Sequence, residues 1–155
     1  MKIRTIVLML LLLCMFGLAA SFAAENPNMG TWKLNEAKSS FAPRATKNST
    51  VVYEAQGDSV KITQDGTRDD KPVHSEWTGK FDGKDYPVTG DPHTDTRSYT
   101  KVNDRTLSVT VKKDGKVVNS ARAVVSADGK TRTANLSGTD SAGKKVTGTA
   151  VYDKQ

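Results

Sequence analysis

The sequence predicts an all-β fold, an antiparallel up-and-down meander of about nine or ten strands closed into a barrel. Two observations carry this prediction. Turn signals such as Asp-Gly, which tolerate the positive φ of a tight hairpin, recur along the chain. Between them lie stretches of alternating polar and apolar residues rich in Val, Thr and Tyr, the pattern of half-buried strands. The turn signals are Gly57-Asp58, Asp65-Gly66, Asp82-Gly83, Asn103-Asp104, Asp114-Gly115, Asp128-Gly129 and Ala142-Gly143.

Residues 1–23 are expected to be an export signal rather than part of the fold. Lys2 and Arg4 form a basic start, an apolar run covers 6–18, and Ser21-Phe22-Ala23 fits the small-x-small cleavage pattern. The run is too short and wrongly flanked for a transmembrane helix, although a retained signal anchor is the alternative. Cys14 would be removed with the signal, so no disulfide or thiolate is available to the mature chain. We expect an exported protein of the periplasm or extracellular space, not membrane-spanning after cleavage.

Residues 24–155 have the length of a single domain. Losing Lys2 and Arg4 lowers the net charge from +6 to +4, and the remaining basic residues are interleaved with Asp. No basic cluster of the kind that follows a phosphate backbone is present, so nucleic-acid binding is disfavoured. Leu, Ile, Val and Phe are scarce in this segment, which predicts an interior lined by many small or hydroxylated side chains.

The elements are predicted in order along the chain. The first strand covers Gly30 to Leu34 and carries Trp32. An irregular segment follows from Asn35 to Lys47, with one helical turn near Glu36 to Ser39. Prolines and Gly90 between Tyr86 and Asp95 indicate a brief strand and then a loop. The other strands are predicted at 48–55, 59–64, 73–81, 96–102, 105–112, 116–126, 130–138 and 145–153.

The segment from Val73 to Phe81 is the clearest amphipathic strand. Val73, Ser75, Trp77, Gly79 and Phe81 share one face, whereas His74, Glu76, Thr78 and Lys80 share the other, where His74 is expected to be exposed. Closing such a meander removes its exposed edges, which favours a barrel over an open sheet. The outward faces carry Lys, Glu, Asp and Thr, so an outer-membrane barrel with a lipid-facing apolar band is disfavoured.

Short motifs at the two ends of the barrel segment resemble the calycins, the superfamily of lipocalins and fatty-acid-binding proteins. Gly30-Thr31-Trp32 is similar to their opening Gly-x-Trp strand. Val151-Tyr152-Asp153-Lys154 is similar to the closing strand of fatty-acid-binding proteins, in which an inward Arg and Tyr two residues apart hold a carboxylate; here Ala150 stands at the Arg position. The resemblance implies a lipocalin-like barrel around a ligand cavity. The helix pair of that family has no clear counterpart in residues 35–47.

A second resemblance covers nearly the whole mature segment. The chain is similar to small exported bacterial proteins of uncharacterised function that share a Gly-Thr-Trp-Lys-Leu-Asn start and a final Val-Tyr-x-Lys-Gln. The shared internal motifs are Asp-Gly-Lys-Asp-Tyr-Pro-Val-Thr-Gly at 82–90 and Val-Ser-Ala-Asp-Gly-Lys at 125–130. This resemblance implies a fold and a compartment but no activity.

Residues Asp91-Pro92-His93-Thr94-Asp95 form the loop with the most site-like composition. A His and two carboxylates so close together are the residue types of a metal site or of an acid and base pair. A solvated loop is the alternative, and no nucleophile elbow, zinc-protease motif or phosphate-binding loop occurs. The sequence therefore predicts no enzyme, no cofactor, no metal and no catalytic residue, with an enzyme that uses this loop as the least favoured hypothesis.

The preferred hypothesis is an exported barrel that binds a small apolar or amphipathic molecule without catalysis. The predicted ligand-lining residues are the inward set, Trp32, Tyr53, Ile62, Trp77, Phe81, Leu107, Val109 and Tyr152. The same residues would simply fill a packed barrel, because small barrels are often solid. The alternative is then a ligand-free interaction or inhibitor-like module, with an envelope protein as a possible partner.

Overall fold

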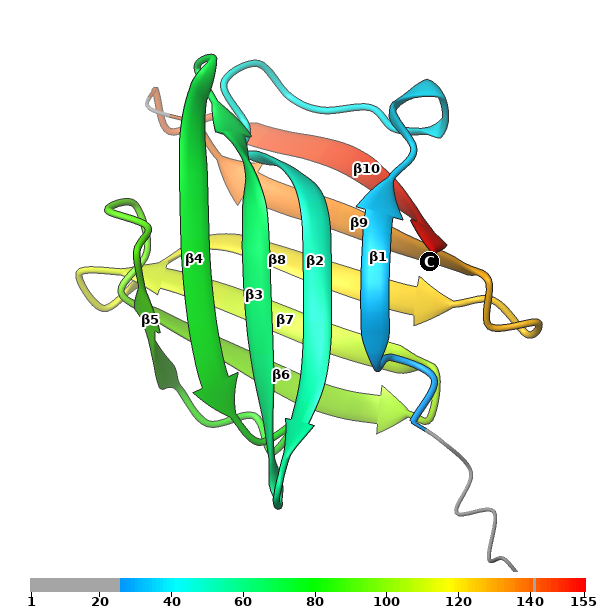
Figure 1. Cartoon of the computed structure of the whole chain (residues 1–155). Coiled ribbons are helices and arrows are strands. Elements are labelled where there is room, and N and C mark those ends of the chain that lie inside the picture. Colours follow the sequence, from blue (N-terminus) through cyan, green and yellow to red (C-terminus); the bar gives the residue numbers. More distant parts are fainter. Residues whose placement is uncertain (1–25, 141) are drawn as a thin grey trace, which may run out of the picture.

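The computed structural model describes residues 26–140 and 142–155; the predicted signal and its cleavage site lie outside these residues. The chain forms one closed antiparallel barrel in the order β1-β10-β9-β8-β7-β6-β5-β4-β3-β2 (Figure 1). The predicted fold class is thereby confirmed, with ten strands. They are β1 (Gly30–Leu34), β2 (Lys47–Gln56), β3 (Ser59–Arg68), β4 (Lys71–Gly79), β5 (Tyr86–Thr89), β6 (Thr96–Asn103), β7 (Thr106–Lys113), β8 (Lys116–Val125), β9 (Thr131–Thr139) and β10 (Lys145–Lys154).

Most predicted turns coincide with hairpin ends, because glycine there adopts the positive φ that the turn requires. Gly57, Gly115 and Gly129, for example, have φ of 60°, 71° and 72°. The predicted helical turn is the 3₁₀ helix η1 (Glu36–Lys38), where the Asn35 side chain accepts a hydrogen bond from the backbone N–H of Lys38.

The turn predicted at Asp65-Gly66 is wrong, because β3 continues through it to Arg68. The reversal lies at Asp69 and Asp70, which both adopt positive φ, 48° and 59°, as a tight two-residue hairpin requires. Gly66 instead lies opposite a β-bulge in β2, where a Cβ would come within 2.1 Å of the backbone oxygen of Lys47. Glycine is needed at position 66 because the backbones of β2 and β3 approach each other too closely there for a side chain.

One end of the barrel is packed solid. Trp32, Ile62 and Leu107 are fully buried there. The indole Nε1 of Trp32 donates to the backbone oxygen of Asn28 at 3.0 Å, and Asn28 Nδ2 donates to the backbone oxygen of Asp104 at 3.2 Å. The segment before β1 thus crosses beneath the strands and closes this end, which we call the floor.

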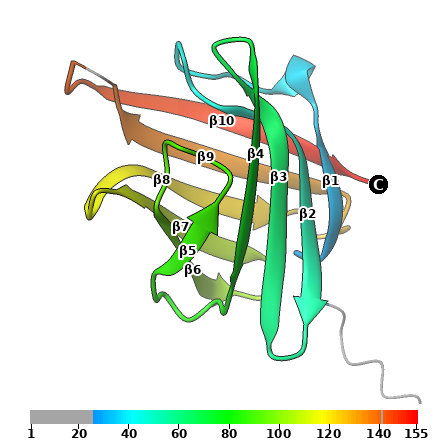
Figure 2. The same cartoon turned by 60° about the vertical axis from the view of Figure 1, so that its left-hand side comes forward.

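The opposite end, which we call the mouth, is formed by the β1–β2 connection and by the β3–β4, β5–β6, β7–β8 and β9–β10 turns (Figure 2). The β1–β2 connection, residues 35–46, holds the one short helix of the part of the chain that the structure describes. No helix among these residues is long and apolar enough to cross a membrane.

Candidate functional site

A cavity of about 560 Å³ occupies the interior between the floor and the mouth. This volume lies within the range typical of small-molecule sites. Apolar side chains from six strands line much of it: Val51, Val73, Val109, Val111, Ala121, Ala123, Ala134, Leu136 and Val146. Loop residues of the mouth, including Pro43, Pro92 and His93, line its outer part and are exposed. The cavity therefore connects an apolar interior with solvent.

Two buried arginines line this cavity. Arg97 on β6 is 6% exposed and Arg132 on β9 is 5% exposed. Arg97 Nη1 and Arg132 Nε are buried without a hydrogen-bond partner. Buried arginines are rare unless paired, because an uncompensated charge in a low-dielectric interior is costly. Such a nitrogen in a cavity wall is free to donate to an anion that enters the cavity.

Within residues 26–140 and 142–155, no counter-ion pairs with these arginines. No ion pair between residues of the described ranges includes Arg97 or Arg132. The carboxylates that line the cavity are Asp91 and Asp140, and both lie at the mouth. Asp91 accepts hydrogen bonds within its own turn, and Asp140 accepts from the backbone N–H groups of Ala142 and Lys144 at 2.9 Å each.

Tyrosines surround the guanidinium of Arg132. Its Cζ lies 4.4 Å from the ring centroid of Tyr53, within cation–π distance, and Tyr152 is its direct cross-strand neighbour on β10. Burial raises the pKa of Tyr152 to about 12, against the opposing effect of the Arg132 charge, and burial likewise raises the pKa of Tyr53. Both phenols therefore stay protonated at neutral pH and keep an O–H available as a donor beside the guanidinium.

An aromatic cluster fixes the strand that carries Arg97. The indole Nε1 of Trp77 donates to the backbone oxygen of Arg97 at 2.7 Å, and its ring lies 4.6 Å from the ring of Tyr99. Tyr86 packs edge-on against Trp77 with centroids 5.7 Å apart. Gly79 makes this possible, because a Cβ there would come within 2.6 Å of the Tyr86 ring.

The structure separates the predicted ligand-lining residues into two groups. Tyr53, Val109 and Tyr152 line the cavity. The other five, Trp32, Ile62, Trp77, Phe81 and Leu107, are absent from its lining; four are buried in the core, and half-buried Phe81 packs against that core. Whether any of the eight contacts a ligand stays a prediction.

Sequence reasoning missed Arg97, Arg132 and Tyr99. A signal for them existed in the alternation of each strand. Arg97 shares a face with Tyr99, and Arg132 shares a face with Ala134 and Leu136. A single Arg among the inward-facing, apolar positions of a strand indicates one of two things. Either the register of the strand has been assigned wrongly, or the charge is buried for a function.

The loop of Asp91, His93 and Asp95 is built around its own hydrogen bonds. Asp91 Oδ1 accepts from the backbone N–H of His93 at 2.9 Å. Asp95 pairs with Lys113 Nζ at 2.6 Å and accepts from the backbone N–H of Asp114 at 2.7 Å, and the Lys113 contact lowers the pKa of Asp95. Asp95 thus ties the β5–β6 turn to the β7–β8 turn, whereas Asp91 holds its own turn together. Residues 26–140 and 142–155 contain no group of three or more His, Cys, Asp or Glu placed to hold a metal ion.

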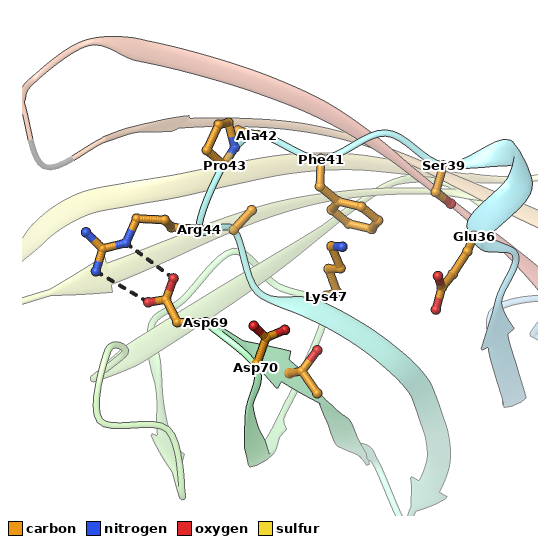
Figure 3. Close-up of a pocket in the computed structure, with 11 residues that line it drawn as sticks. Glu36, Ser39, Phe41, Ala42, Pro43, Arg44, Lys47, Asp69 and Asp70 are labelled. Atoms are coloured by element: carbon orange, nitrogen blue, oxygen red, sulfur yellow. Dashed lines mark hydrogen bonds and ion pairs between the residues drawn. The ribbon is translucent and has the colours of Figure 1, made fainter.

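A second pocket, of about 430 Å³, lies between the β1–β2 connection and the β3–β4 turn (Figure 3). Arg44 donates from Nε and Nη2 to the two carboxylate oxygens of Asp69, at 3.3 and 3.4 Å, and so joins the two segments. Residues 41–45 line both this pocket and the interior cavity. They form a thin wall between the two spaces.

Comparison with known proteins supports the architecture. No protein-family profile and no curated protein sequence matches the chain. Among solved structures, the chain is similar to a Schistosoma mansoni fatty acid binding protein in complex with arachidonic acid. The TM-score is 0.54 and the identity 18%, and the match covers 83% of this chain and 96% of the other. At this identity the likeness shows a common fold, a closed antiparallel barrel.

Proposed function

We propose that this barrel binds a small amphipathic molecule, with an anionic head group at Arg97 and Arg132 and an apolar tail directed toward the mouth. The observation that carries the proposal is the pair of buried guanidinium groups that have orphaned nitrogens and, among the residues that the structure describes, no carboxylate partner. An anion brought by a ligand would supply the missing counter-charge. Hydrogen bonds to charged groups are among the stronger ones in proteins, since each contributes about 1.5–3 kcal/mol.

The apolar wall on the mouth side of Arg132 suits a hydrocarbon tail. Ala123 and Ala134, neighbours on β8 and β9, leave open space beside Arg132, and Val109 and Leu136 line the same cavity. Each methylene group that leaves water for such a surface contributes about 0.8 kcal/mol. The related fold of a fatty acid binding protein supports the proposal, and the role is that of a carrier or sensor without catalysis. The N-terminal signal pattern extends the proposal to an exported protein.

Calorimetric titration of the delipidated protein tests this function. Three anionic amphiphiles of equal tail length, decanoate, decyl sulfate and decyl phosphate, are compared with neutral decanol, all below their micelle-forming concentrations. We expect at least one anion to bind more tightly than decanol, and Arg132→Gln to weaken that anion by about tenfold to a hundredfold. Native mass spectrometry of protein from its own host should show a co-purifying acidic amphiphile.

Arg122→Gln is the matched control, since Arg122 lies on β8 with an exposed side chain. This variant removes the same charge from the outside of the barrel and should bind like the wild type. Equal binding of decanol and all three anions would overturn the proposal, as would an equal loss of binding in Arg122→Gln and Arg132→Gln.

A further inference from the structure

The two interior arginines approach the same place from different walls of the barrel. Arg132 stands on β9 and Arg97 on β6, with β7 and β8 between them in the sheet. Both arginines line the same cavity, and the guanidinium of Arg132 lies 4.4 Å from the ring of Tyr53. Tyr99, two residues after Arg97, packs edge-on against the same ring with centroids 6.5 Å apart, so the strand of Arg97 also reaches Tyr53. Both charges lower the pKa of Tyr53, against the larger effect of burial. A head group in this cavity would therefore share it with two cations.

Charge balance separates the possible head groups. A guanidinium stays protonated in proteins, so the site carries two positive charges at any physiological pH. A carboxylate or sulfate ester brings one negative charge and leaves one buried cation uncompensated, which is costly. A head group with two negative charges balances both.

The supply of donors points the same way. Two guanidinium groups and the phenols of Tyr53 and Tyr152 line this part of the cavity. One arginine fork already satisfies a planar carboxylate through two parallel hydrogen bonds. A second fork from another wall requires additional oxygens in another plane, which a tetrahedral group provides.

On these grounds, and resting on the proposed function, we propose that the ligand is an amphiphile with a dianionic tetrahedral head group, a phosphate monoester. The shared chemistry is a terminal phosphate. This phosphate belongs either to a lipid of the phosphatidic type or to a smaller phosphorylated metabolite. Binding of inorganic phosphate, measured in the same experiment, distinguishes these two sources.

The experiment compares three head groups on one tail, at two pH values. Decyl phosphate is a tetrahedral dianion above its second pKa of about 6 and a monoanion below it. Decyl sulfate is a tetrahedral monoanion throughout and controls for shape, and decanoate is the planar monoanion. At about pH 8 we expect decyl phosphate to bind about tenfold more tightly than either comparison ligand, because the second negative charge lies near a second cation.

Lowering the pH to about 5 should remove this advantage, because the phosphate then carries a single charge. Other titratable groups lining the cavity are Tyr53, Tyr99 and Tyr152 inside it and His93, Asp91 and Asp140 at the mouth, with Arg44, Arg68 and Lys113 as fixed charges. Decyl sulfate keeps one charge over this range, so its own pH response measures their effect. The effect of the second negative charge is therefore the change with pH in the affinity of decyl phosphate relative to that of decyl sulfate.

Arg97→Gln supplies the second readout. The variant should lose the preference for phosphate and still bind decyl sulfate within about threefold of the wild type, since Arg132 alone balances one charge.

A titration with inorganic phosphate tells the two sources of the ligand apart. If inorganic phosphate binds as tightly as decyl phosphate, the ligand is a soluble phosphorylated metabolite. The assignment of the head group would then hold, and the requirement for an apolar tail would be overturned. Equal binding of decyl sulfate, decanoate and decyl phosphate at about pH 8 would overturn the dianion while leaving an anionic amphiphile as the function. No binding of any anion above decanol would overturn both.

Discussion

Arg132 on β9 lies directly opposite Tyr152 on β10, so the guanidinium and the phenol share the inner face of the barrel although twenty residues separate them in the chain. The same guanidinium lies 4.4 Å from the ring of Tyr53, which comes from β2 on the other side of β1. Among the described residues no carboxylate pairs with this cation, so its burial costs free energy on folding, and the proposed ligand would supply the counter-charge. This cost leads to the first prediction.

Removing either interior arginine should leave the ligand-free protein as stable as the wild type, or more stable. Arg132→Gln and Arg97→Gln each delete a buried charge that has no counter-ion among the described residues, and this removes the desolvation cost of that charge. The cation–π contact of Arg132 with Tyr53 offsets part of the gain, by about 0.5–2 kcal/mol. Urea unfolding of delipidated protein measures the effect.

Arg122→Gln, on the outer face, should change the free energy of unfolding by no more than about 0.5 kcal/mol. A loss of stability of several kcal/mol in the interior variants alone would mean that the arginines hold the barrel together. Their orphaned nitrogens would then be no evidence of a ligand.

Sequence reasoning failed at this pair because strand register is not visible in a single strand. In fatty-acid-binding proteins an arginine lies two residues before the tyrosine on the same strand, and in this chain that position is Ala150. The structure supplies an arginine from the neighbouring strand, since the antiparallel register sets Arg132 beside Tyr152. Position in a barrel depends on register, and register is fixed by turns and bulges spread over the whole sheet.

Elsewhere the sequence predicted the fold well, because period-two alternation and positive-φ turns are local properties. In the strand of Trp77 the predicted phase is confirmed: Trp77 is 1% exposed, and His74 and Thr78 are exposed. The wrong turn at Asp65-Gly66 had a local cause as well. Asp-Gly tolerates a turn without requiring one, and the pairing of β3 with β2 and β4 extended the strand past it.

The phase of this strand gives the second prediction, a contrast between Trp77 and Glu76. Trp77→Ala should lower the free energy of unfolding by about 3–5 kcal/mol, because it leaves a large hole among Phe81, Tyr86 and Tyr99. Glu76→Ala removes partly exposed contacts with Lys61 at 2.9 Å and with His74 at 3.8 Å, and should cost less than about 1 kcal/mol. Chemical unfolding monitored by circular dichroism measures both.

The indole of Trp77 also donates a hydrogen bond to the backbone oxygen of Arg97. Trp77→Phe keeps an aromatic ring in the core but removes this donor. We therefore expect Trp77→Phe to reduce the free energy of ligand binding by more than it reduces the free energy of unfolding. Similar stability losses in Trp77→Ala and Glu76→Ala would contradict the assigned phase of the strand.

The third prediction concerns pH and His74. The hydrogen bond between His74 Nδ1 and Asp65 Oδ1, at 2.7 Å, raises the pKa of His74. A histidine whose folded pKa is raised adds stability at pH values below its unfolded pKa of about 6.5, and that stability is lost as the pH rises through the folded value. Wild-type stability relative to Asp65→Asn should therefore fall between mildly acidic and mildly alkaline pH.

Nuclear magnetic resonance titration of the His74 ring checks the cause directly. The pKa should lie above 6.5 in the wild type and fall in Asp65→Asn, in which the partner at 2.7 Å loses its charge. An unchanged His74 pKa in Asp65→Asn would show that the contact does not persist in solution.

The fourth prediction tests where the ligand tail lies. Ala123, Ala134 and Ala150 form a row of cross-strand neighbours on β8, β9 and β10, one layer toward the mouth from Arg132. Ala134 lines the cavity, so Ala134→Leu places three further carbons in the space beside the arginine. A shorter tail should still fit, whereas a longer one should lose contact with the wall.

The measurement is the change in binding free energy with tail length, from hexyl to dodecyl, on a common anionic head group. In the wild type each added methylene should strengthen binding by up to about 0.8 kcal/mol until the tail reaches the mouth, and Ala134→Leu should end this gain at a shorter tail. Asn135→Leu is the matched control, because the neighbouring side chain is exposed on the outer face and adds the same leucine outside the barrel. If Ala134→Leu and Asn135→Leu give the same dependence on tail length, the tail does not run past the row of alanines, and the ligand must lie along another wall of the cavity.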